Sequence, residues 1–387
     1  MDVAIVGAGP AGASAAYRLA RAGARVTIFD PSHPREKPCG GGVTGRALSL
    51  VRDALDDLPV RATTIRTARF IDARSGRQAM VQLKDGALVV SDRRTFDAAL
   101  LDAAVRAGAL HIRSRVLHVT TFPSIAIRTR DATYSADFLI GADGAAGATR
   151  RMLARPFTRA QLSIAAGCFV RGVTSDEIVV EMTADPPGYF WSFPRATHLA
   201  VGVCAQADED VSAGDLRHRA ARWADDAELT QAGRSVEWYS WPIPSLGAGD
   251  FADQVLAGRD WCLVGDAAGL VDPITREGIY FAVASGAWAA EAIGGGREAM
   301  REYTARVHDE ASGELAAAAR LKAGFFRPSF SALLLDGLES SPRIRAVMAD
   351  LVAGTQSYRT LKWRLLNTLE IGLAGRALTT LALARKA

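Results

Sequence analysis

A glycine-rich run near the start of the chain has the spacing of a phosphate-binding turn. Gly7, Gly9 and Gly12 form the pattern GxGxxG between an apolar run at 3–6 and small residues at helical spacing. In such a turn the first glycine permits the bend, the second lets the backbone approach a pyrophosphate, and the third lets helix and strand pack closely. Asp30 follows where a carboxylate can accept a hydrogen bond from a ribose hydroxyl. Together these features predict a dinucleotide site.

A second glycine turn lies far along the chain. The apolar run at 263–265 leads into a turn with Asp266 at its tip, and the polar loop 272–278 then opens a helix. The N-terminus of such a helix carries a partial positive charge.

A cysteine-glycine loop, KPCGGG, lies between these two turns. Its thiol, Cys39, has Lys37 nearby, and a cation can favour the reactive thiolate form. Cys39 is therefore a candidate catalytic or redox-active residue, although it can equally be a small residue chosen to fit a tight loop. The other three cysteines lie in apolar segments and are expected to be inert core residues, namely Cys168, Cys204 and Cys262.

The elements around the first turn form a βαβ unit. Its strands are expected at 3–6 and 24–30 around a helix over 13–23, followed by an extended loop at 31–45. Beyond this loop we expect β-alternation at 65–90, a helix at 94–107, and strands at 111–119 and 136–144.

The middle of the chain has a different pattern. Strands are expected at 164–173, 177–183, 189–194, 198–206 and 235–243, with a helix at 215–231. This pattern predicts a mostly antiparallel sheet inserted into a discontinuous Rossmann-type α/β domain. A buried strand returns near 262, a helix follows over 278–293, and the chain is expected to be helical from Arg301 onward.

These patterns divide the chain into three parts. The nucleotide-binding domain is expected at 1–64, 88–156 and 255–310, and the substrate domain at 65–87 and 157–254. A helical C-terminal region, 311–387, completes the predicted α/β and α+β architecture.

The two glycine turns and the cysteine loop together resemble the geranylgeranyl reductase family, within the flavoproteins related to p-hydroxybenzoate hydroxylase. The resemblance implies FAD as cofactor, with Asp266 on the ribityl hydroxyls. Gly278 and Ile279 would offer backbone N–H groups to the pyrimidine edge of the flavin ring. The helix dipole would stabilise negative charge on the reduced ring.

Further motifs extend the resemblance to about Tyr303. It implies that the loop with Cys39, Gly40 and Gly42 lies near the flavin, and that Arg93 in the element RRTFD contacts the cofactor. It also implies that Val116 contacts the adenine through backbone groups. The Asp143–Gly144 pair resembles a motif linked to FAD and nicotinamide cofactors.

The segment 186–194 matches the pattern PxxYxWxFP, the most specific of these motifs for the family. Tyr189 and Trp191 alternate along a strand, so both are expected to face one side and form the floor of an apolar substrate cavity. The chain departs from the resemblance at Gly147, where a serine is common. It departs again at Arg276 and Glu277, where small residues are frequent. These departures bear on the substrate more than on the cofactor.

The resemblance implies a reductase that saturates carbon–carbon double bonds of a polyprenyl group, with hydride from N5 of reduced FAD. The electrons would come from NADPH or ferredoxin. The alternative on the same scaffold is an aromatic hydroxylase that uses NAD(P)H and oxygen. A non-enzymatic flavin- or lipid-binding protein is less favoured. The segment WYSWPIP is one residue longer than a halogenase motif, WxWxIP, so we expect a strand whose tryptophans pack in the core.

Composition excludes several other classes. The chain has 387 residues, 49% of them hydrophobic, and a net charge of +4, with no basic run that would indicate nucleic-acid binding. There is no CxxC pair, no metal-ligand spacing, no secretory signal and no transmembrane-length apolar run, so a cytoplasmic protein without a metal is expected. The basic, apolar segment from Ser340 onward could contact an anionic membrane, or pack as an ordinary helix with a solvated face.

Overall fold

The computed structural model describes residues 1–387 except 56–59, 209–210, 231–235, 297, 369, 371 and 373–387. Its first layer is a parallel sheet in the order β18–β12–β1–β2–β8, as the predicted Rossmann-type domain requires. The strands are β1 (Asp2–Val6), β2 (Arg25–Phe29), β8 (Leu110–Ile112), β12 (Phe138–Gly141) and β18 (Trp261–Leu263). They come from three separate parts of the chain, so this domain is discontinuous.

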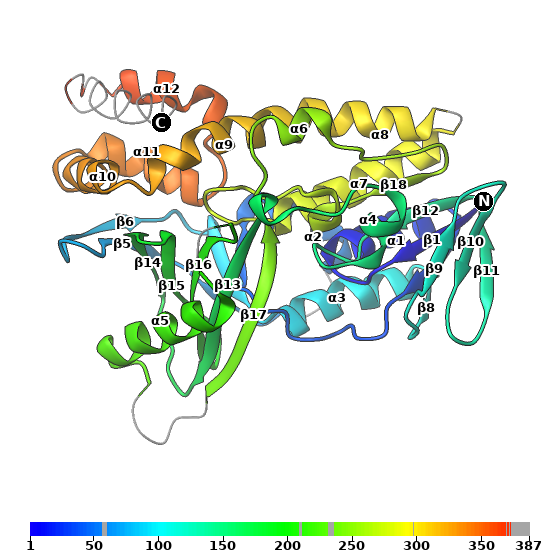
Figure 1. The fold of residues 1–387 in the computed structure, drawn as a ribbon, viewed down its shortest axis with the longest axis horizontal. Helices are drawn as coiled ribbons and strands as arrows, with labels where there is room; N and C mark the ends of the chain where they lie inside the picture. The colour runs from blue at the N-terminus through cyan, green and yellow to red at the C-terminus, as the bar shows by residue number, and fades with distance from the viewer. Residues whose placement is uncertain are drawn as a thin grey trace.

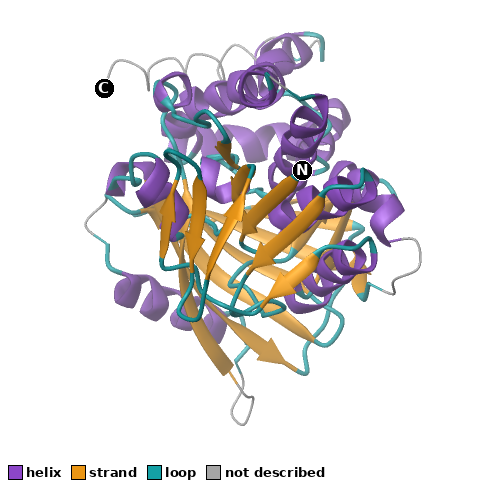
Figure 2. Ribbon diagram, turned by 90° about the vertical axis from the view of Figure 1, so that its right-hand side faces the viewer, coloured by secondary structure: helices purple, strands orange, loops and turns teal. Residues whose placement is uncertain are grey.

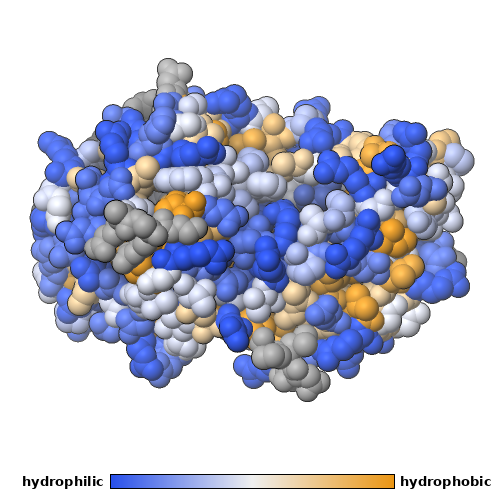
Figure 3. Space-filling view, turned by 90° about the horizontal axis from the view of Figure 1, so that it is seen from below, coloured by the Kyte–Doolittle hydropathy of each residue, from blue (hydrophilic) through white to orange (hydrophobic). Residues whose placement is uncertain are grey.

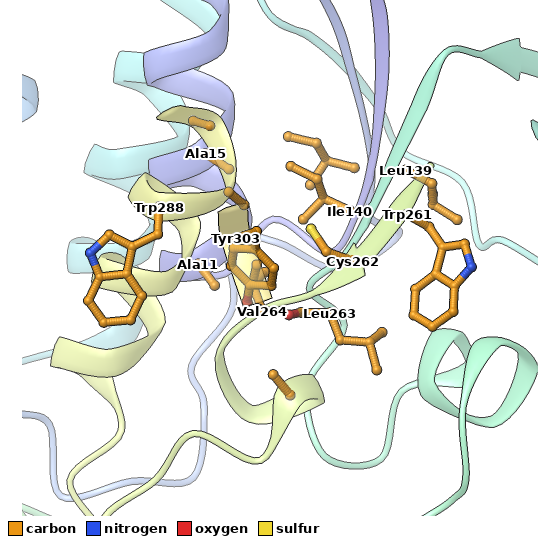
Figure 4. Close-up of a cluster of buried hydrophobic side chains, with 14 of the residues drawn as sticks. Ala11, Ala15, Leu139, Ile140, Trp261, Cys262, Leu263, Val264, Trp288 and Tyr303 are labelled. Atoms are coloured by element: carbon orange, nitrogen blue, oxygen red, sulfur yellow. Dashed lines mark hydrogen bonds between the residues drawn. The ribbon is translucent and has the colours of Figure 1, made fainter. Parts of the chain in front are cut away.

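Helices pack closely against this sheet. They are α1 (Pro10–Arg21), α3 (Arg93–Arg106) and α7 (Ile279–Gly295), close to the expected ranges. Small residues allow the approach of α1 to α7, because a Cβ at Gly286 would lie 2.2 Å from the carbonyl oxygen of Ala11. Figure 4 shows the core beside them, where the Tyr303 hydroxyl donates to the Leu263 carbonyl at 2.6 Å.

Smaller elements surround this layer. Two three-stranded sheets have the orders β11–β10–β9 and β3–β7–β4. Their strands are β3 (Gly42–Thr44), β4 (Ala62–Thr64), β7 (Leu88–Ser91), β9 (His118–Thr120), β10 (Ile125–Arg128) and β11 (Thr133–Ala136). Short helices complete the layer, namely α2 (Gly45–Leu55), α4 (Ala148–Leu153) and α6 (Asp250–Asp253).

The second layer is a seven-stranded sheet in the order β17–β13–β16–β15–β14–β5–β6. Only β14 and β5 pair in parallel, so the sheet is mostly antiparallel, as predicted. Its strands are β5 (Thr67–Asp72), β6 (Gln78–Gln82), β13 (Leu162–Arg171), β14 (Glu177–Ala184), β15 (Pro187–Pro194), β16 (His198–Gln206) and β17 (Val236–Pro244). Helix α5 (Ala213–Asp226) covers one face, where Leu216 and Ala220 pack on Ala166 and Val203.

C-terminal helices cover the opposite face of this sheet. Figure 1 shows α10 and α11 lying above β5, β6 and β14, with α12 outermost, and Figure 2 shows these helices gathered at one end of the molecule. The C-terminal helices are α9 (Gly313–Phe325), α10 (Pro328–Ser340), α11 (Pro342–Val352) and α12 (Tyr358–Leu366). Helix α8 (Ala299–Val307) comes before them and packs on α7, and a π-helical turn at His308–Ser312 joins it to α9. No helix of the described residues is both long and apolar enough to cross a bilayer.

Two predictions of single elements were wrong. The segment 111–119 is not one strand, because the chain turns after β8, where Ser114 N–H donates to the Ile112 carbonyl at 2.8 Å, and β9 joins another sheet. The expected loop at 31–45 ends early, because β3 pairs with β7 and α2 begins at Gly45. The predicted ends at Gln231 and Ser235, and the tail beyond 372, lie outside the described residues.

Candidate active site

A cavity of about 590 Å³ lies where the two large sheets meet, beneath α9–α12. Of the residues predicted from sequence, all except Gly12 line it. They are Gly7, Gly9, Asp30, Cys39, Gly40, Gly42, Arg93, Val116, Tyr189, Trp191, Asp266, Gly278 and Ile279. The fold therefore brings to one place residues that lie up to 272 positions apart, from Gly7 to Ile279.

The three glycines of the first turn are needed for different reasons. Gly7 has a φ of +107°, and a Cβ at Gly12 would lie 2.0 Å from the Gly7 carbonyl oxygen, so both positions need glycine for the fold itself. A Cβ at Gly9 would meet only Nε2 of His33, at 3.8 Å. Helix α1 has no side-chain cap and no acid in its first turn. Its free N–H groups and the open space above Gly9 suit a pyrophosphate.

Both carboxylate oxygens of Asp30 already accept hydrogen bonds from protein groups. One oxygen accepts N–H from Ala8 at 2.9 Å and contacts His33 Nδ1 at 2.8 Å. The other accepts from the backbone and hydroxyl of Ser32 and from the His33 backbone. Burial would raise the pKa of Asp30, but His33 and these N–H groups hold it well below its usual range. Asp30 thus orders the turn, and its contact with a ribose hydroxyl stays a prediction.

A buried charge chain continues from Asp30 through His33. The ring of His33 reaches Asp97 at 3.3 Å, and Asp97 accepts two hydrogen bonds from Arg93, at 2.9 and 2.8 Å. Burial lowers the pKa of His33, but Asp30 and Asp97 outweigh it and the net shift is upward. Much of the Arg93 guanidinium is therefore committed to Asp97, while its side chain still lines the cavity. Sequence reasoning missed His33 and Asp97.

The raised pKa of His33 predicts a specific pH dependence. Its ion pairs stabilise the fold fully below the unfolded pKa of about 6.5, and this contribution is lost as pH rises through the higher folded pKa. Between pH 6.5 and 9 the wild type should therefore lose more unfolding free energy than His33→Asn, measured by urea denaturation. Parallel pH profiles for the two proteins would contradict this assignment.

The cysteine loop is held from two sides. A Cβ at Gly40 would lie 2.7 Å from the Phe193 ring, and one at Gly41, where φ is +88°, would lie 2.4 Å from the Ser91 carbonyl oxygen. The thiol of Cys39 accepts the Gly41 N–H at 3.2 Å. The glycines are thus needed for close packing, and they present Cys39 to the cavity.

Arg195 anchors this loop and was not identified from sequence. Its side chain is fully buried, and its guanidinium binds Glu36 at 2.5 Å, Asp92 at 3.4 Å and the Cys39 carbonyl at 2.7 Å. It also lies over the Phe169 ring, 4.6 Å from the centroid. The one available signal was a cation placed directly after the PxxYxWxFP strand.

The second glycine turn places Asp266 beside the start of α7. Lys37 Nζ binds the Asp266 carboxylate at 2.8 Å, so its charge is paired with an acid that sequence reasoning did not connect to it. Gly278 is the N-cap of α7, and the first turn of this helix carries no acid. Asp266 and the N–H groups near Ile279 therefore border the same part of the cavity.

Tyr189 and Trp191 share one face of β15, as predicted. Their rings lie edge to face with centroids 6.1 Å apart, and the Tyr189 hydroxyl donates to the Thr275 carbonyl at 2.7 Å. The Trp191 ring covers Gly202, where a Cβ would come within 2.5 Å of it. This pair closes the floor of the cavity and ties it to the loop before α7.

The structure explains one departure from the family pattern. Gly147 leaves room for Asp143, because a Cβ there would lie 2.1 Å from that carboxylate. Asp143 in turn accepts the Thr149 N–H at 3.0 Å, and burial raises the pKa of its carboxyl.

The prediction that the tryptophans of β17 pack in the core was wrong. Trp238 is 37% exposed, and Trp241 lines the cavity with Arg35 over its ring. The buried aromatic residue of this strand is Tyr239, because alternate residues of β17 face opposite sides and the strand lies at the sheet edge.

The cavity walls leave polar atoms without partners. Among the described residues, buried side-chain atoms that lack a hydrogen bond occur in five residues of the lining, namely Thr44, Arg46, Trp191, Trp241 and Arg276. Folded proteins rarely leave such atoms unpaired, so a bound polar ligand is indicated. With the open phosphate-binding turn at the uncapped N-terminus of α1 and the start of α7 beside Asp266, the residues present fit FAD.

Sequence comparison agrees with this site. Residues 1–287 match the family model described as FAD binding domain. A geranylgeranyl diphosphate reductase of Rhodobacter capsulatus is 30% identical over 311 residues, 75% of this chain and 74% of that protein. A digeranylgeranylglycerophospholipid reductase of Methanothrix thermoacetophila is 29% identical over 358 residues, 85% of this chain and 88% of that protein.

Solved structures share the fold. A geranylgeranyl bacteriochlorophyll reductase-like protein from Thermoplasma acidophilum has a TM-score of 0.79 at 22% identity, over 95% of this chain and 98% of that one. A flavin-dependent brominase has a TM-score of 0.71 at 19% identity, over 95% and 99%. Fold and site together define an FAD-dependent oxidoreductase. The chain belongs to the geranylgeranyl reductase family of these flavoproteins.

Proposed function

We propose that the protein saturates carbon–carbon double bonds of a polyprenyl group. The observation that carries this proposal is the apolar half of the cavity, which lies between the seven-stranded sheet and the C-terminal helices. Its walls are formed by side chains that suit a long hydrocarbon chain, namely Phe70, Ile178, Val180, Met182, Phe325, Phe330, Leu334, Ile344 and Met348. The names of the two relatives support the same substrate class.

The protein's own contribution is positioning. When bound, FAD supplies the hydride chemistry, and NADPH or ferredoxin is the proposed source of electrons. The turn at Gly9 and the N-terminus of α7 hold the cofactor by their N–H groups, while Tyr189 and Trp191 orient the alkene and exclude water. Cys39 is the proposed catalytic thiol. It lines the cavity between the turn at Gly9 and the N-terminus of α7.

The proposal is tested with the purified yellow holoprotein. The flavin is reduced without oxygen, and geranylgeranyl lipids are added. Re-oxidation by the lipid, with a mass gain of two hydrogens per double bond, is the expected result. Re-oxidation by oxygen alone, with an aromatic compound accelerating NAD(P)H oxidation, would establish the hydroxylase alternative instead.

We also propose that α12 contacts an anionic membrane surface, from which a prenyl substrate could enter. None of its residues is fully buried, Trp363 is 66% exposed, and the basic side chains of Arg359 and Lys362 lie beside it. The tail residues Arg376, Arg385 and Lys386 lie outside the described residues. The opposite face, seen in Figure 3, is mostly hydrophilic, with apolar residues in small separate groups.

Charge reversal on α12 should weaken membrane binding. Each basic residue near an anionic surface contributes about 1 kcal/mol. Arg359→Glu with Lys362→Glu should therefore lower co-sedimentation with phosphatidylglycerol vesicles by tenfold or more, as a rough estimate. Trp238→Ala, an exposed tryptophan on β17, is the control. Equal sedimentation of all variants would remove the membrane proposal.

A further inference from the structure

An arginine enters the cavity from the loop before α7, in a backbone conformation that arginine rarely adopts. Arg276 has a φ of +61°, in the left-handed region that favours glycine. Its N–H donates to the Asp272 carbonyl at 2.9 Å, which holds the turn. A strained non-glycine residue that lines a cavity points to a role for its side chain.

The guanidinium of Arg276 lacks protein partners for two of its nitrogens. Its Nε and Nη1 are buried and form no hydrogen bond with any described residue. Buried N–H groups without an acceptor are costly, and a planar guanidinium binds phosphate or carboxylate oxygens in a bidentate manner. The free nitrogens therefore fit an anionic ligand.

The nearby carboxylates do not neutralise Arg276. Asp272 accepts N–H from Ile274 at 2.7 Å and the hydroxyl of Tyr358 at 2.9 Å. Glu277 binds Arg46 at 3.2 Å and accepts the N–H of Tyr280 in the first turn of α7. The contacts of both carboxylates thus hold the loop and the start of α7 in place.

A second cation lies near enough to interact with the charge of Arg276, although it does not line the cavity. Lys322 on α9 donates only to neutral acceptors in the described part of the chain, Gln206 at 3.1 Å and Ser245 at 3.1 and 3.3 Å. Burial, together with the charge of Arg276, lowers the pKa of Lys322 to about 8. A positive field between low-dielectric walls attracts an anion.

We propose that Arg276 binds the anionic head group of the prenyl substrate, a phosphate, diphosphate or carboxylate, and thereby determines specificity and register. This inference rests on the proposed function. Because the loop 272–278 leads directly into α7, a head group on Arg276 places the nearest double bonds of the chain beside the flavin site. The distal chain then extends between β14 and α10–α11, whose side chains line the apolar half of the cavity.

The test compares two probes with the same hydrocarbon chain on the FAD-loaded protein. Geranylgeranyl diphosphate and geranylgeraniol are titrated while the flavin absorption spectrum is followed. Arg276→Gln should weaken diphosphate binding by about 10- to 100-fold and change alcohol binding less than about twofold. Arg320→Gln, which removes an exposed charge from α9, should change neither. Arg276→Gly, which relieves the left-handed strain, should lose the same discrimination while it retains FAD.

The contrary outcomes separate the possibilities. If the diphosphate and the alcohol both bind and Arg276→Gln affects them equally or not at all, the head-group role is wrong and the prenyl function stands. If the variant changes the flavin midpoint potential but not the discrimination between probes, the cation serves the cofactor and the proposal is overturned. If neither probe binds the wild type, the prenyl function falls together with this inference.

Discussion

Gly9→Ala is expected to give a folded protein that no longer retains FAD. The backbone of Gly9 has a φ of −70° and a ψ of −178°, which alanine adopts without strain, and a Cβ there meets no protein atom closer than 3.8 Å. Replacing glycine by alanine at a helix N-cap lowers the free energy of unfolding by less than about 1 kcal/mol. The methyl group, however, occupies the space through which a pyrophosphate reaches the N–H groups of α1. Losing these charge-assisted bonds should weaken FAD binding about a hundredfold or more.

Gly12→Ala is the matched comparison. Its Cβ would lie 2.0 Å from the Gly7 carbonyl oxygen, so the helix must move away from the strand, at a cost of about 1–3 kcal/mol. This variant should lose both stability and cofactor, whereas Gly9→Ala loses only the cofactor. Flavin absorbance after purification, circular dichroism and urea denaturation of the apoproteins distinguish the two. A Gly9→Ala protein as yellow as the wild type would show that the pyrophosphate does not bind at this turn.

Features with a local cause were readable from the sequence. The requirements at Gly7 and Gly12 arise from a strand, a turn and a helix that are adjacent in the chain, and the shared face of Tyr189 and Trp191 follows from strand geometry. The alternating pattern of the middle segment likewise predicted the mostly antiparallel sheet. The limits of the domains and the roles of the individual site residues stay predictions.

Contacts between residues far apart in the sequence could not be predicted from it. Lys37 was interpreted beside its sequence neighbour Cys39, but it pairs with Asp266, 229 positions away. Asp30 accepts the N–H of Ala8, 22 positions earlier, a contact that sequence reasoning did not anticipate. A break in a strand, as at 111–119, is also hard to detect, because apolar residues continue on both sides of the turn while the chain changes sheet. In each case the partner is selected by the fold.

The second large effect is expected at Arg195, which joins the seven-stranded sheet to the cysteine loop. Arg195→Met retains the volume and removes the charge, leaving the carboxylates of Glu36 and Asp92 without their shared cation. Removing one member of a buried ion pair costs about 3–5 kcal/mol, and the lower end is expected here because both carboxylates are partly exposed. The Cys39 carbonyl also loses its donor, so the loop should become mobile and FAD binding should weaken as well.

A second substitution separates charge from packing. Glu36 also accepts the N–H groups of Arg93 and Arg94 at the start of α3, one on each oxygen, so Glu36→Gln retains an acceptor for one of them while it removes one unpaired charge. The double variant Arg195→Met with Glu36→Gln should therefore recover part of the unfolding free energy lost in Arg195→Met. The exposed Arg94→Met is the control and should stay within about 0.5 kcal/mol of the wild type. If Arg195→Met unfolds at the wild-type urea concentration and retains its flavin, the fully buried guanidinium does not hold the loop, and the close contacts of Gly40 and Gly41 with Phe193 and Ser91 must be sufficient.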